Sequence, residues 1–329
     1  MAWISVFLVA ATALLALKGT AIIQLGQVEE PEALRIALAK WPPYDLLHLA
    51  QELGYFEEEG VLVELEEFST QGDCRRAFER GQVDSMSASS LELVMASEFS
   101  KRNPKAFVVI DESLGGDALV TAKRVRSLSD LAGKRIGAES GTVNILLLHE
   151  ALNQAGLFAS QVEIVNLTQA EMPEALAGGM VDAVCTYYPY TEEVIARGGH
   201  ILFTSLNAPG AIIDMLVTDE NTLKSRTEGL AAMTRAYLRA VDYLQKHPDK
   251  TIDYIAERQK MDTDTTRKIF TSHVRIVTAD EQAEWLDPAG KAAQSANRAV
   301  KALKATGFLD EVKQSDFITK EILSALRQD

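Results

Sequence analysis

The chain contains 329 residues, of which 47% are hydrophobic and 24% are charged. This composition is typical of a globular protein of one or two domains, and it excludes a fibrous or disordered chain. Acidic residues outnumber Lys and Arg by 47 to 33, which leaves a net charge of -14. A surface of this sign argues against nucleic acid as a partner.

An almost unbroken apolar run opens the chain, from Ala2 to Leu17, and is followed by Lys18-Gly19-Thr20-Ala21. The run is shorter than the ~20 apolar residues that a membrane-spanning helix needs. Small residues after an apolar segment are typical of a signal-peptidase site, so residues 1–21 are predicted to be a secretory signal peptide. An uncleaved N-terminal anchor is the alternative. Either one would place the protein in the periplasm or on the extracytoplasmic face of the membrane.

Strands and helices are predicted to alternate after this segment, because the apolar residues recur first at strand spacing and then at helix spacing. The expected elements are a strand at 34–39, a proline turn at 41–44, a helix at 44–53 ended by Gly54, a strand at 61–68, a helix at 72–81 and a strand beginning at Val83. A second series follows: a strand at 134–138, a helix at 141–155 ended by Gly156, a strand at 162–167 and a helix at 171–178. Such alternation predicts an α/β fold with parallel strand pairing and helices on both faces of each sheet.

The two series share short motifs at equivalent places. Gly81-Gln82-Val83-Asp84 matches Gly179-Met180-Val181-Asp182, and residues 117–121 match residues 214–218. Two equivalent α/β units have a cleft between them, where small ligands bind. Asp84 and Asp182 are expected to order the turns that follow their glycines.

Beyond Asp219 the chain is predicted to be mostly helical, from residue 223 to residue 326, and to pack back on the first unit. The two cysteines, Cys74 and Cys185, lie in different units, so a disulfide would join the units. Two free, buried thiols are the simpler interpretation.

The sequence contains no phosphate-binding loop and no nucleophile elbow, and its five histidines lack metal-ligand spacing. We therefore expect no catalytic residues, no metal site and no cofactor.

The chain resembles the periplasmic substrate-binding proteins of ABC importers, in the nitrate/sulfonate/taurine branch that includes pyrimidine-precursor binders. The resemblance rests on the order and spacing of several segments, which extend over residues 34–220: Trp41 and Tyr44 before residues 49–56, residues 59–64, Gly81-Gln82-Val83-Asp84, Glu139-Ser140-Gly141-Thr142, residues 152–157, residues 179–183, Tyr187, Pro189 and Tyr190. It implies a two-lobed periplasmic binding protein fold (type II) with two crossover strands and a helical C-terminal tail on the first lobe. The implied lobes are residues 33–118 with 214–329, and residues 119–213.

Ligand-binding residues are expected where strands meet helices in the cleft. Ser140, Gly141 and Thr142 open a helix whose free N–H groups can bind an anion, although Ser140 could simply cap that helix. Trp41 and Tyr44 occupy the matching turn of the first unit and could enclose an apolar or cationic group.

Hydroxyl and aromatic side chains follow other strands of the two units. The further candidates are Ser69, Thr70, Ser87, Ser89, Tyr187, Tyr188, Tyr190 and Asp214. Ser69, Thr70, Ser87 and Ser89 could equally cap helices, and Asp214 could bind an amine or anchor the hinge. The family often has an acidic residue before the proline at 189, whereas this chain has Tyr188.

The resemblance implies a monomeric solute-binding protein that closes around a small-molecule ligand and delivers it to an ABC permease membrane subunit. The helix start at Gly141 and the aromatic turn at Trp41 together predict a small organic anion, sulfonate-like or carboxylate-like. The alternatives are a pyrimidine- or thiamine-precursor binding protein, an enzyme on the same fold, and a membrane-anchored sensory module.

Overall fold

The computed structural model describes residues 32–312 and 316–326. The predicted signal peptide or anchor at residues 1–21 lies outside the described residues. The chain divides into Met1–Glu32 and Ala33–Asp329, and both sheets belong to the second unit. Within the described residues, no helix has the length and apolar character needed to cross a membrane.

The first sheet has six strands, in the order β11-β4-β10-β3-β1-β2. Their bounds are β1 (Leu34–Ala39), β2 (Val63–Phe68), β3 (Ser85–Ser89), β4 (Pro104–Ser113), β10 (Ile213–Asp219) and β11 (Val274–Ile276). β1 is parallel to β2 and β3, as the alternating pattern predicts. β10 runs antiparallel between β3 and β4, because it enters this sheet from the opposite side after the chain has left the second sheet.

The second sheet has five strands, in the order β7-β6-β8-β5-β9. Their bounds are β5 (Asp117–Thr121), β6 (Arg135–Ala138), β7 (Glu163–Asn166), β8 (Ala183–Tyr187) and β9 (His200–Thr204). β6 is parallel to β7 and β8, and β5 is antiparallel to β8. Asp117 pairs with Tyr187 just as Asp214 pairs with Ser89, which confirms the repeat at the level of strand register.

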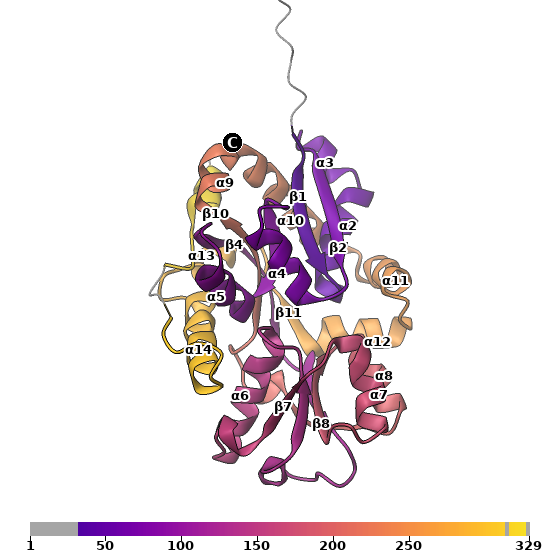
Figure 1. Ribbon diagram of the computed structural model, residues 1–329. Coiled ribbons are helices and arrows are strands. Elements are labelled where there is room, and N and C mark those ends of the chain that lie inside the picture. The colour runs from indigo at the N-terminus through magenta and orange to yellow at the C-terminus, as the bar shows by residue number, and fades with distance from the viewer. Residues whose placement is uncertain (1–31, 313–315, 327–329) are drawn as a thin grey trace, which may run out of the picture. The chain divides into compact units, whose positions relative to one another are not determined.

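Helices cover both faces of the sheets, and Figure 1 shows α6 on one side of β7 and β8, with α7 and α8 on the other. The helices before the tail are α2 (Asp45–Glu52), α3 (Tyr55–Glu58), α4 (Gln71–Glu79), α5 (Ser90–Phe99), α6 (Val143–Ala155), α7 (Met172–Ala177) and α8 (Tyr190–Ala196). Short turns are η1 (Pro42–Tyr44), η2 (Leu128–Leu131), η3 (Ala159–Gln161), η4 (Gln169–Glu171), η5 (Ser205–Asn207) and the π-helical η6 (Ile269–His273). The predicted helix at 44–53 therefore starts one residue late, because Pro42 and Pro43 open a separate 3-10 turn.

The C-terminal tail packs on the first sheet and its helices. Its helices are α9 (Glu220–Ser225), α10 (Thr227–Lys246), α11 (Pro248–Gln259), α12 (Thr263–Lys268), α13 (Gln282–Trp285), α14 (Lys291–Ala305) and α15 (Glu321–Ala325). Gln259 donates to Asp45 on α2 at 2.7 Å, and Gln282 donates to the carbonyl of Val109 on β4 at 2.7 Å. The tail is mostly helical, as predicted. The prediction did not include β11, a three-residue strand that forms because the edge of β4 offers it unpaired backbone groups.

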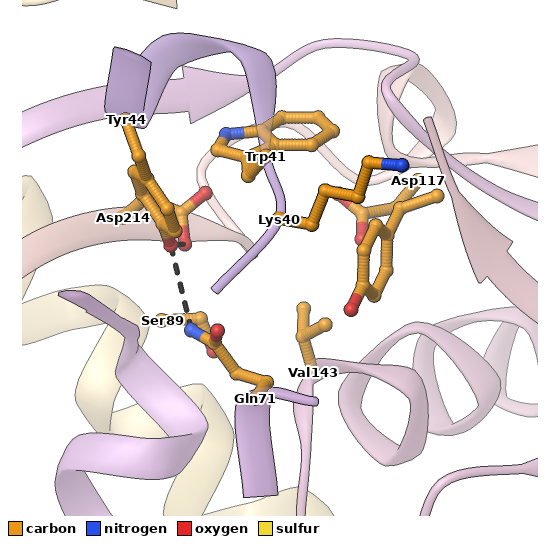
Figure 2. Close-up of a pocket in the computed structure, with 9 residues that line it drawn as sticks. Lys40, Trp41, Tyr44, Gln71, Ser89, Asp117, Val143 and Asp214 are labelled. Carbon is orange, nitrogen blue, oxygen red and sulfur yellow. Dashed lines mark hydrogen bonds between the residues drawn. The ribbon is translucent and has the colours of Figure 1, made fainter. Parts of the chain in front are cut away.

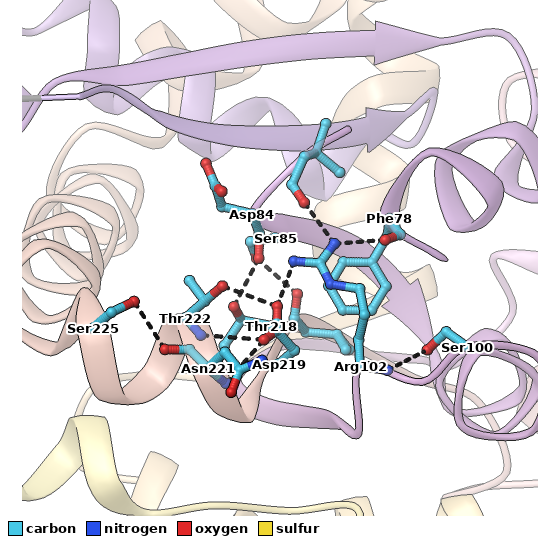
Figure 3. A network of polar contacts seen from close by, with 12 residues as sticks. Phe78, Asp84, Ser85, Ser100, Arg102, Thr218, Asp219, Asn221, Thr222 and Ser225 are labelled. Carbon is cyan, nitrogen blue, oxygen red and sulfur yellow. Dashed lines mark hydrogen bonds and ion pairs between the residues drawn. The ribbon is translucent and has the colours of Figure 1, made fainter. Parts of the chain in front are cut away.

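Arg102 joins the start of the tail to the first sheet (Figure 3). Its guanidinium donates to the carbonyls of Phe78 and Val83, at 2.5 and 2.8 Å, and forms an ion pair with Asp219. Asp219 also caps α9, since its Oδ1 accepts the N–H of Asn221 at 2.9 Å. One buried carboxylate thus ends β10, begins α9 and holds Arg102 in place.

The repeated aspartates hold neighbouring strands together instead of ordering turns, which corrects the sequence prediction. The Asp84 carboxylate accepts the N–H of Arg35 at 2.9 Å, and that of Asp182 accepts the N–H of Arg135 at 2.9 Å. The N–H of each aspartate donates in return to the carbonyl of the same arginine. Each aspartate–arginine pair therefore adds one charge-assisted contact to the parallel strand pairing, near the first residues of the strands.

Cys74 and Cys185 are both buried and both free, which confirms the simpler interpretation. The two thiols contribute to the apolar interior and do not link the units covalently.

Replacing Asp182 with Ala should lower the free energy of unfolding by about 1.5–3 kcal/mol at pH 7, the range for hydrogen bonds to charged groups. Partial burial alone would raise the pKa of Asp182, but bonds from the Arg135 N–H and from Arg124 lower it below its ordinary 3.8. The stabilisation is therefore present above pH 3.8 and is lost as the pH falls through the lowered value. Urea unfolding at pH 7 and at pH 3 measures both effects.

The control is Glu174→Ala, which removes an exposed ion pair with Arg197 and should change the stability by no more than about 0.5 kcal/mol. Equal losses in the two variants would contradict the assigned role of Asp182.

Candidate functional site

A small inner pocket lies between the two sheets, beyond the ends of β1, β3 and β8 (Figure 2). Its volume is about 20 Å³, which is enough for about one water molecule. The lining residues are Lys40, Trp41, Tyr44, Gln71, Ser89, Asp117, Val143, Tyr187 and Asp214. Both sheets contribute, which is where a ligand of a two-unit α/β protein is expected.

Trp41 forms one wall of the inner pocket. Its indole N–H donates to the Asp111 carboxylate at 3.1 Å, and its ring meets Tyr187 edge-on with the centroids 6.1 Å apart. Gly116 passes so close that a Cβ there would lie 2.5 Å from the indole ring. The indole is thus packed between Gly116, where the chain first passes from one sheet to the other, and Tyr187 of the second sheet. These contacts fix its orientation before any ligand binds.

Tyr44 and Asp214 form a second wall. The Tyr44 hydroxyl donates to the Asp214 carboxylate at 2.9 Å, and the Gln71 amide lies 3.5 Å from the same hydroxyl (Figure 2). Gln71 also donates to the carbonyl of Ser87 at 3.4 Å. The amide therefore connects α4 to β3 at the floor of the pocket.

Three buried carboxyl groups, Asp111, Asp117 and Asp214, surround this pocket. Asp111 and Asp214 are register partners on β4 and β10, and none of the three is more than 6% exposed. Burial raises the pKa of Asp117 to about 7. Burial, together with repulsion between the carboxyl groups, also raises the pKa values of Asp111 and Asp214. At neutral pH such a group of acids is partly protonated, so it offers both donors and acceptors of hydrogen bonds, and a cation nearby would favour the ionised forms.

The start of α6, the expected anion site, is already occupied by a carboxylate of this chain. Glu92 on α5 is fully buried, and its Oε1 accepts the Val143 N–H at 2.8 Å. The other oxygen of Glu92 accepts the N–H of Ser89 at 3.0 Å and also binds the Ser89 hydroxyl. The positive end of α6 is therefore used for an internal contact between the two halves of the fold.

Ser140, Gly141 and Thr142 are predicted to bind the ligand, but they line neither the inner pocket nor the larger pocket that adjoins it. The Ser140 N–H donates to Asn166 at 2.8 Å, and the Thr142 hydroxyl donates to the carbonyl of Glu139 at 2.8 Å. Gly141 has a φ of 72°, and a Cβ there would lie 2.9 Å from Met95. These three residues let α6 approach α5 closely, and the cap position belongs to Thr142, not to Ser140.

The remaining candidates divide among several places. Ser89 and Tyr187 line the inner pocket, whereas Ser87 accepts the N–H of Ala39 at 3.3 Å. Tyr188 stacks on His273 with the ring centroids 5.5 Å apart and lines neither pocket. Ser69, Thr70 and Tyr190 line a second, larger pocket, and Thr70 also caps α4 by accepting the Asp73 N–H at 3.0 Å.

This outer pocket has a volume of about 670 Å³ and shares Lys40 and Tyr44 with the inner one. Its other lining residues come from the ends of β1 and β2, from α2, from the loop before α7, from Tyr190 and from the end of α11. The inner and outer pockets together therefore follow the junction between the halves of the fold.

The sequence interpretation missed Lys40, Gln71, Val143 and the carboxylates of Asp111, Asp117 and Glu92 as parts of the site. The internal repeat did point to Asp117, because Asp117 is the equivalent of the candidate Asp214 in the other unit. Asp111 and Glu92 had a weaker signal, since each is an acidic residue inside an otherwise apolar segment.

Comparisons with known proteins agree with this geometry. A family model described as NMT1/THI5 like matches residues 43–251. The chain is 25% identical over 258 residues to the formylaminopyrimidine-binding protein of Halalkalibacterium halodurans, covering 75% of this chain and 77% of that one. It is 25% identical over 225 residues to the taurine-binding periplasmic protein of Escherichia coli, covering 67% and 69% of the respective chains.

Two solved structures show the same fold. The alkanesulfonate-binding protein SsuA of Xanthomonas axonopodis pv. citri, bound to MOPS, matches with a TM-score of 0.70 at 16% identity, covering 89% of this chain and 98% of that one. The desulfurization enzyme DSZB matches with a TM-score of 0.60 at 16% identity, covering 89% and 98%. These matches confirm the predicted two-lobed α/β fold, which is shared by binding proteins and at least one enzyme.

Replacing Asp117 with Asn should flatten the dependence of stability on pH. A carboxyl with a folded-state pKa of about 7 and an ordinary value of 3.8 takes up a proton on folding between these values. Its contribution is fully present below pH 3.8 and is lost as the pH rises through 7. When the pH is lowered from 7 to 5, the free energy of unfolding of the wild type should therefore rise by on the order of 2 kcal/mol. The variant should not show this rise.

Urea unfolding at the two pH values measures this difference. Glu257→Gln removes an exposed carboxylate of α11 and should leave the wild-type pH dependence unchanged. An unaltered pH dependence in Asp117→Asn would show that Asp117 is ionised in the folded protein at pH 7.

Proposed function

This chain belongs to the NMT1/THI5-like family, and we propose that it is the extracytoplasmic solute-binding component of an ABC import system. It captures a small nitrogen-bearing solute between its lobes and delivers it to a membrane permease as an exported monomer. The observation that carries the proposal is the inner pocket, where aromatic walls and buried carboxyl groups from both sheets converge. The taurine-binding relative, whose name places it in the periplasm, supports the location.

The lobes are residues 33–118 with 214–329, and residues 119–213. The membership of β1–β4, β10 and β11 in one sheet, and of β5–β9 in the other, supports this division. The chain passes between the sheets twice, after β4 and before β10, so the lobes can rotate about two short connections.

Closure of the lobes is the proposed mechanism of capture. Contacts between the halves include the N–H of Gly72 on Glu139, at 3.3 Å, and the N–H of Val143 on Glu92, at 2.8 Å. A ligand that touches Trp41 on one side and Tyr187 on the other gains both contacts only in the closed form. Its differential affinity then shifts the population toward that form, which the permease would recognise.

The chemistry of the inner pocket favours a ligand with amino groups or a protonated nitrogen. Asp117 and Asp214 line the pocket, and Asp111 lies behind Trp41, so N–H donors find acceptors there. A sulfonate or carboxylate in the same place would have to hold these acids in their neutral forms, whereas a protonated nitrogen would pair with their ionised forms. Trp41 and Tyr187 meet edge-on around a volume of about 20 Å³, so an aromatic ring can stack on their faces only after the lobes have opened. An aminopyrimidine combines both features, and one relative is named as a formylaminopyrimidine-binding protein.

We propose no enzymatic activity for this site. Burial raises the pKa values of the Cys74 and Cys185 thiols well above the ordinary 9.0, so neither thiol is an available nucleophile. Among the described residues, no group of histidines, cysteines and acids has the arrangement of a metal site.

A thermal-shift panel tests the ligand class. We expect 4-amino-2-methylpyrimidine to raise the melting temperature, because a ligand at 100 times its Kd adds about 2.7 kcal/mol of stability. Taurine and methanesulfonate should have no effect. The reverse pattern, with sulfonates active and the pyrimidine inactive, would overturn the proposed ligand class in favour of the organic anion.

Two substitutions test which residues bind. Asp117→Asn should weaken binding of the pyrimidine at least tenfold, since a charge-assisted hydrogen bond contributes about 1.5–3 kcal/mol. Ser140→Ala should not, because Ser140 lies outside the inner pocket. Calorimetric titration of both variants, with Glu257→Gln as the control, separates this site from one built on the start of α6.

A further inference from the structure

The outer pocket differs from the inner one in size and in charge. Its volume is about 670 Å³ against about 20 Å³, so it is large enough for a substantial part of an organic ligand. Because Lys40 and Tyr44 line both pockets, a group in the outer pocket adjoins a group in the inner one. A single elongated molecule could therefore occupy both.

Three cationic side chains, those of Lys40, Arg258 and Lys260, line the outer pocket beside two acidic ones, Asp45 and Glu67. The acids are already paired with Arg258, whose Nε lies 3.2 Å from Asp45 and whose terminal nitrogen contacts Glu67. His48 also contacts Glu67, at 3.1 Å. Burial, followed by repulsion from Arg258, lowers the pKa of His48 to about 4, so the imidazole is neutral at pH 7.

Three cationic side chains against two acidic ones leave a net charge of +1 around the outer pocket, and Lys40 and Lys260 are the two cations that make no ion pair there. Both are exposed, and neither has an ion-pair partner among residues 32–312 and 316–326. The Lys40 ammonium lies 5.7 Å from the centre of the Tyr190 ring, which also lines this pocket. Lys260 directly follows α11 in a left-handed conformation with a φ of 54°, which ends the helix at the pocket. The Ser69 hydroxyl lines the same pocket and has no hydrogen-bond partner within the described part of the chain.

We propose that the outer pocket is a second subsite, which binds a carboxylate or phosphate group of the same ligand whose nitrogen-bearing end occupies the inner pocket. The inference rests on the proposed function. The inner pocket supplies acids to the nitrogen end, and the outer pocket supplies Lys40, Lys260 and the Ser69 hydroxyl to the anionic end. In a protein with a net charge of -14, this local excess of cations gives the ligand one orientation.

Three matched probes test the subsite by calorimetry. All are 4-amino-2-methylpyrimidines, and they carry at the 5-position a hydroxymethyl group, a carboxypropyl group or the primary amide of that carboxypropyl group. The carboxylate should bind roughly threefold to tenfold more tightly than its amide, the range expected for two partly exposed ion pairs. The preference should shrink as the salt concentration rises.

The variant Lys260→Gln, at a lysine that lines only the outer pocket, should lower this preference about twofold or more while keeping the binding of the amide probe within about threefold of the wild type. Lys250→Gln is the matched control, since Lys250 is an exposed lysine of the same helix α11 that lines neither pocket. Equal affinities of the carboxylate and the amide for the wild type would overturn the subsite, and so would a preference that is unchanged in Lys260→Gln.

Inorganic phosphate provides a probe that is independent of the inner pocket. Its titration should shift the side-chain 15N signals of Lys40 and Lys260 but not that of Lys250. If none of the pyrimidines binds, the proposed ligand class fails, and the phosphate titration alone decides the subsite. If the 15N signals of all three lysines shifted equally, the shifts would reflect general ionic screening, and the inference would be overturned.

Discussion

Burial of acidic side chains where the chain passes between the two sheets is the constraint on which the rest of this structure depends. Asp111 and Asp214 are register partners on adjacent strands, and Asp117 begins the first strand of the second sheet. Like charges in such positions repel one another and lose their hydration, which costs stability. The fold offsets part of this cost with donors from Trp41 and Tyr44 and by raising the pKa values of the three carboxyl groups. A pocket that retains buried acids despite this loss of stability is suited to a ligand that supplies further hydrogen-bond donors.

A symmetric scaffold carries this asymmetric site. Asp84 and Asp182 make the same paired contacts with Arg35 and Arg135, so each half forms its three parallel strands in the same way. The equivalent turns then diverge, with Trp41 and Tyr44 in one half and Gly141 and Thr142 in the other. The first turn provides ring faces to the pocket. The second provides close packing of α6 against α5, with Glu92 bound to the start of α6. The difference explains why the pocket is aromatic and acidic and is not an anion site at a helix end.

In the arrangement we propose, the two pockets divide the recognition of one ligand between them. Two carboxyl groups, Asp117 and Asp214, line the inner pocket because β5 and β10 begin beside it. Two lysines, Lys40 and Lys260, line the outer pocket because the end of β1 and the end of α11 meet there. The helical tail is therefore part of the binding surface as well as part of the core, since Arg258, Gln259 and Lys260 belong to it.

The sequence by itself determined the α/β class, the internal repeat, the helix-ending glycines at 54 and 156 and the family resemblance. These features depend on local periodicity, on backbone conformations available to glycine and on motif spacing, all of which are written along the chain. It also identified Trp41, Tyr44, Ser89, Tyr187 and Asp214, which line the inner pocket. Only the tertiary structure decided the charge of the site. The site combines Asp214 with Glu92, Asp111 and Asp117, which lie up to 122 residues from it in the sequence. Whether a carboxyl group is hydrated, paired or buried beside another depends on neighbours that only the folded chain brings together. For the same reason, the sequence could not show that Glu92 occupies the start of α6.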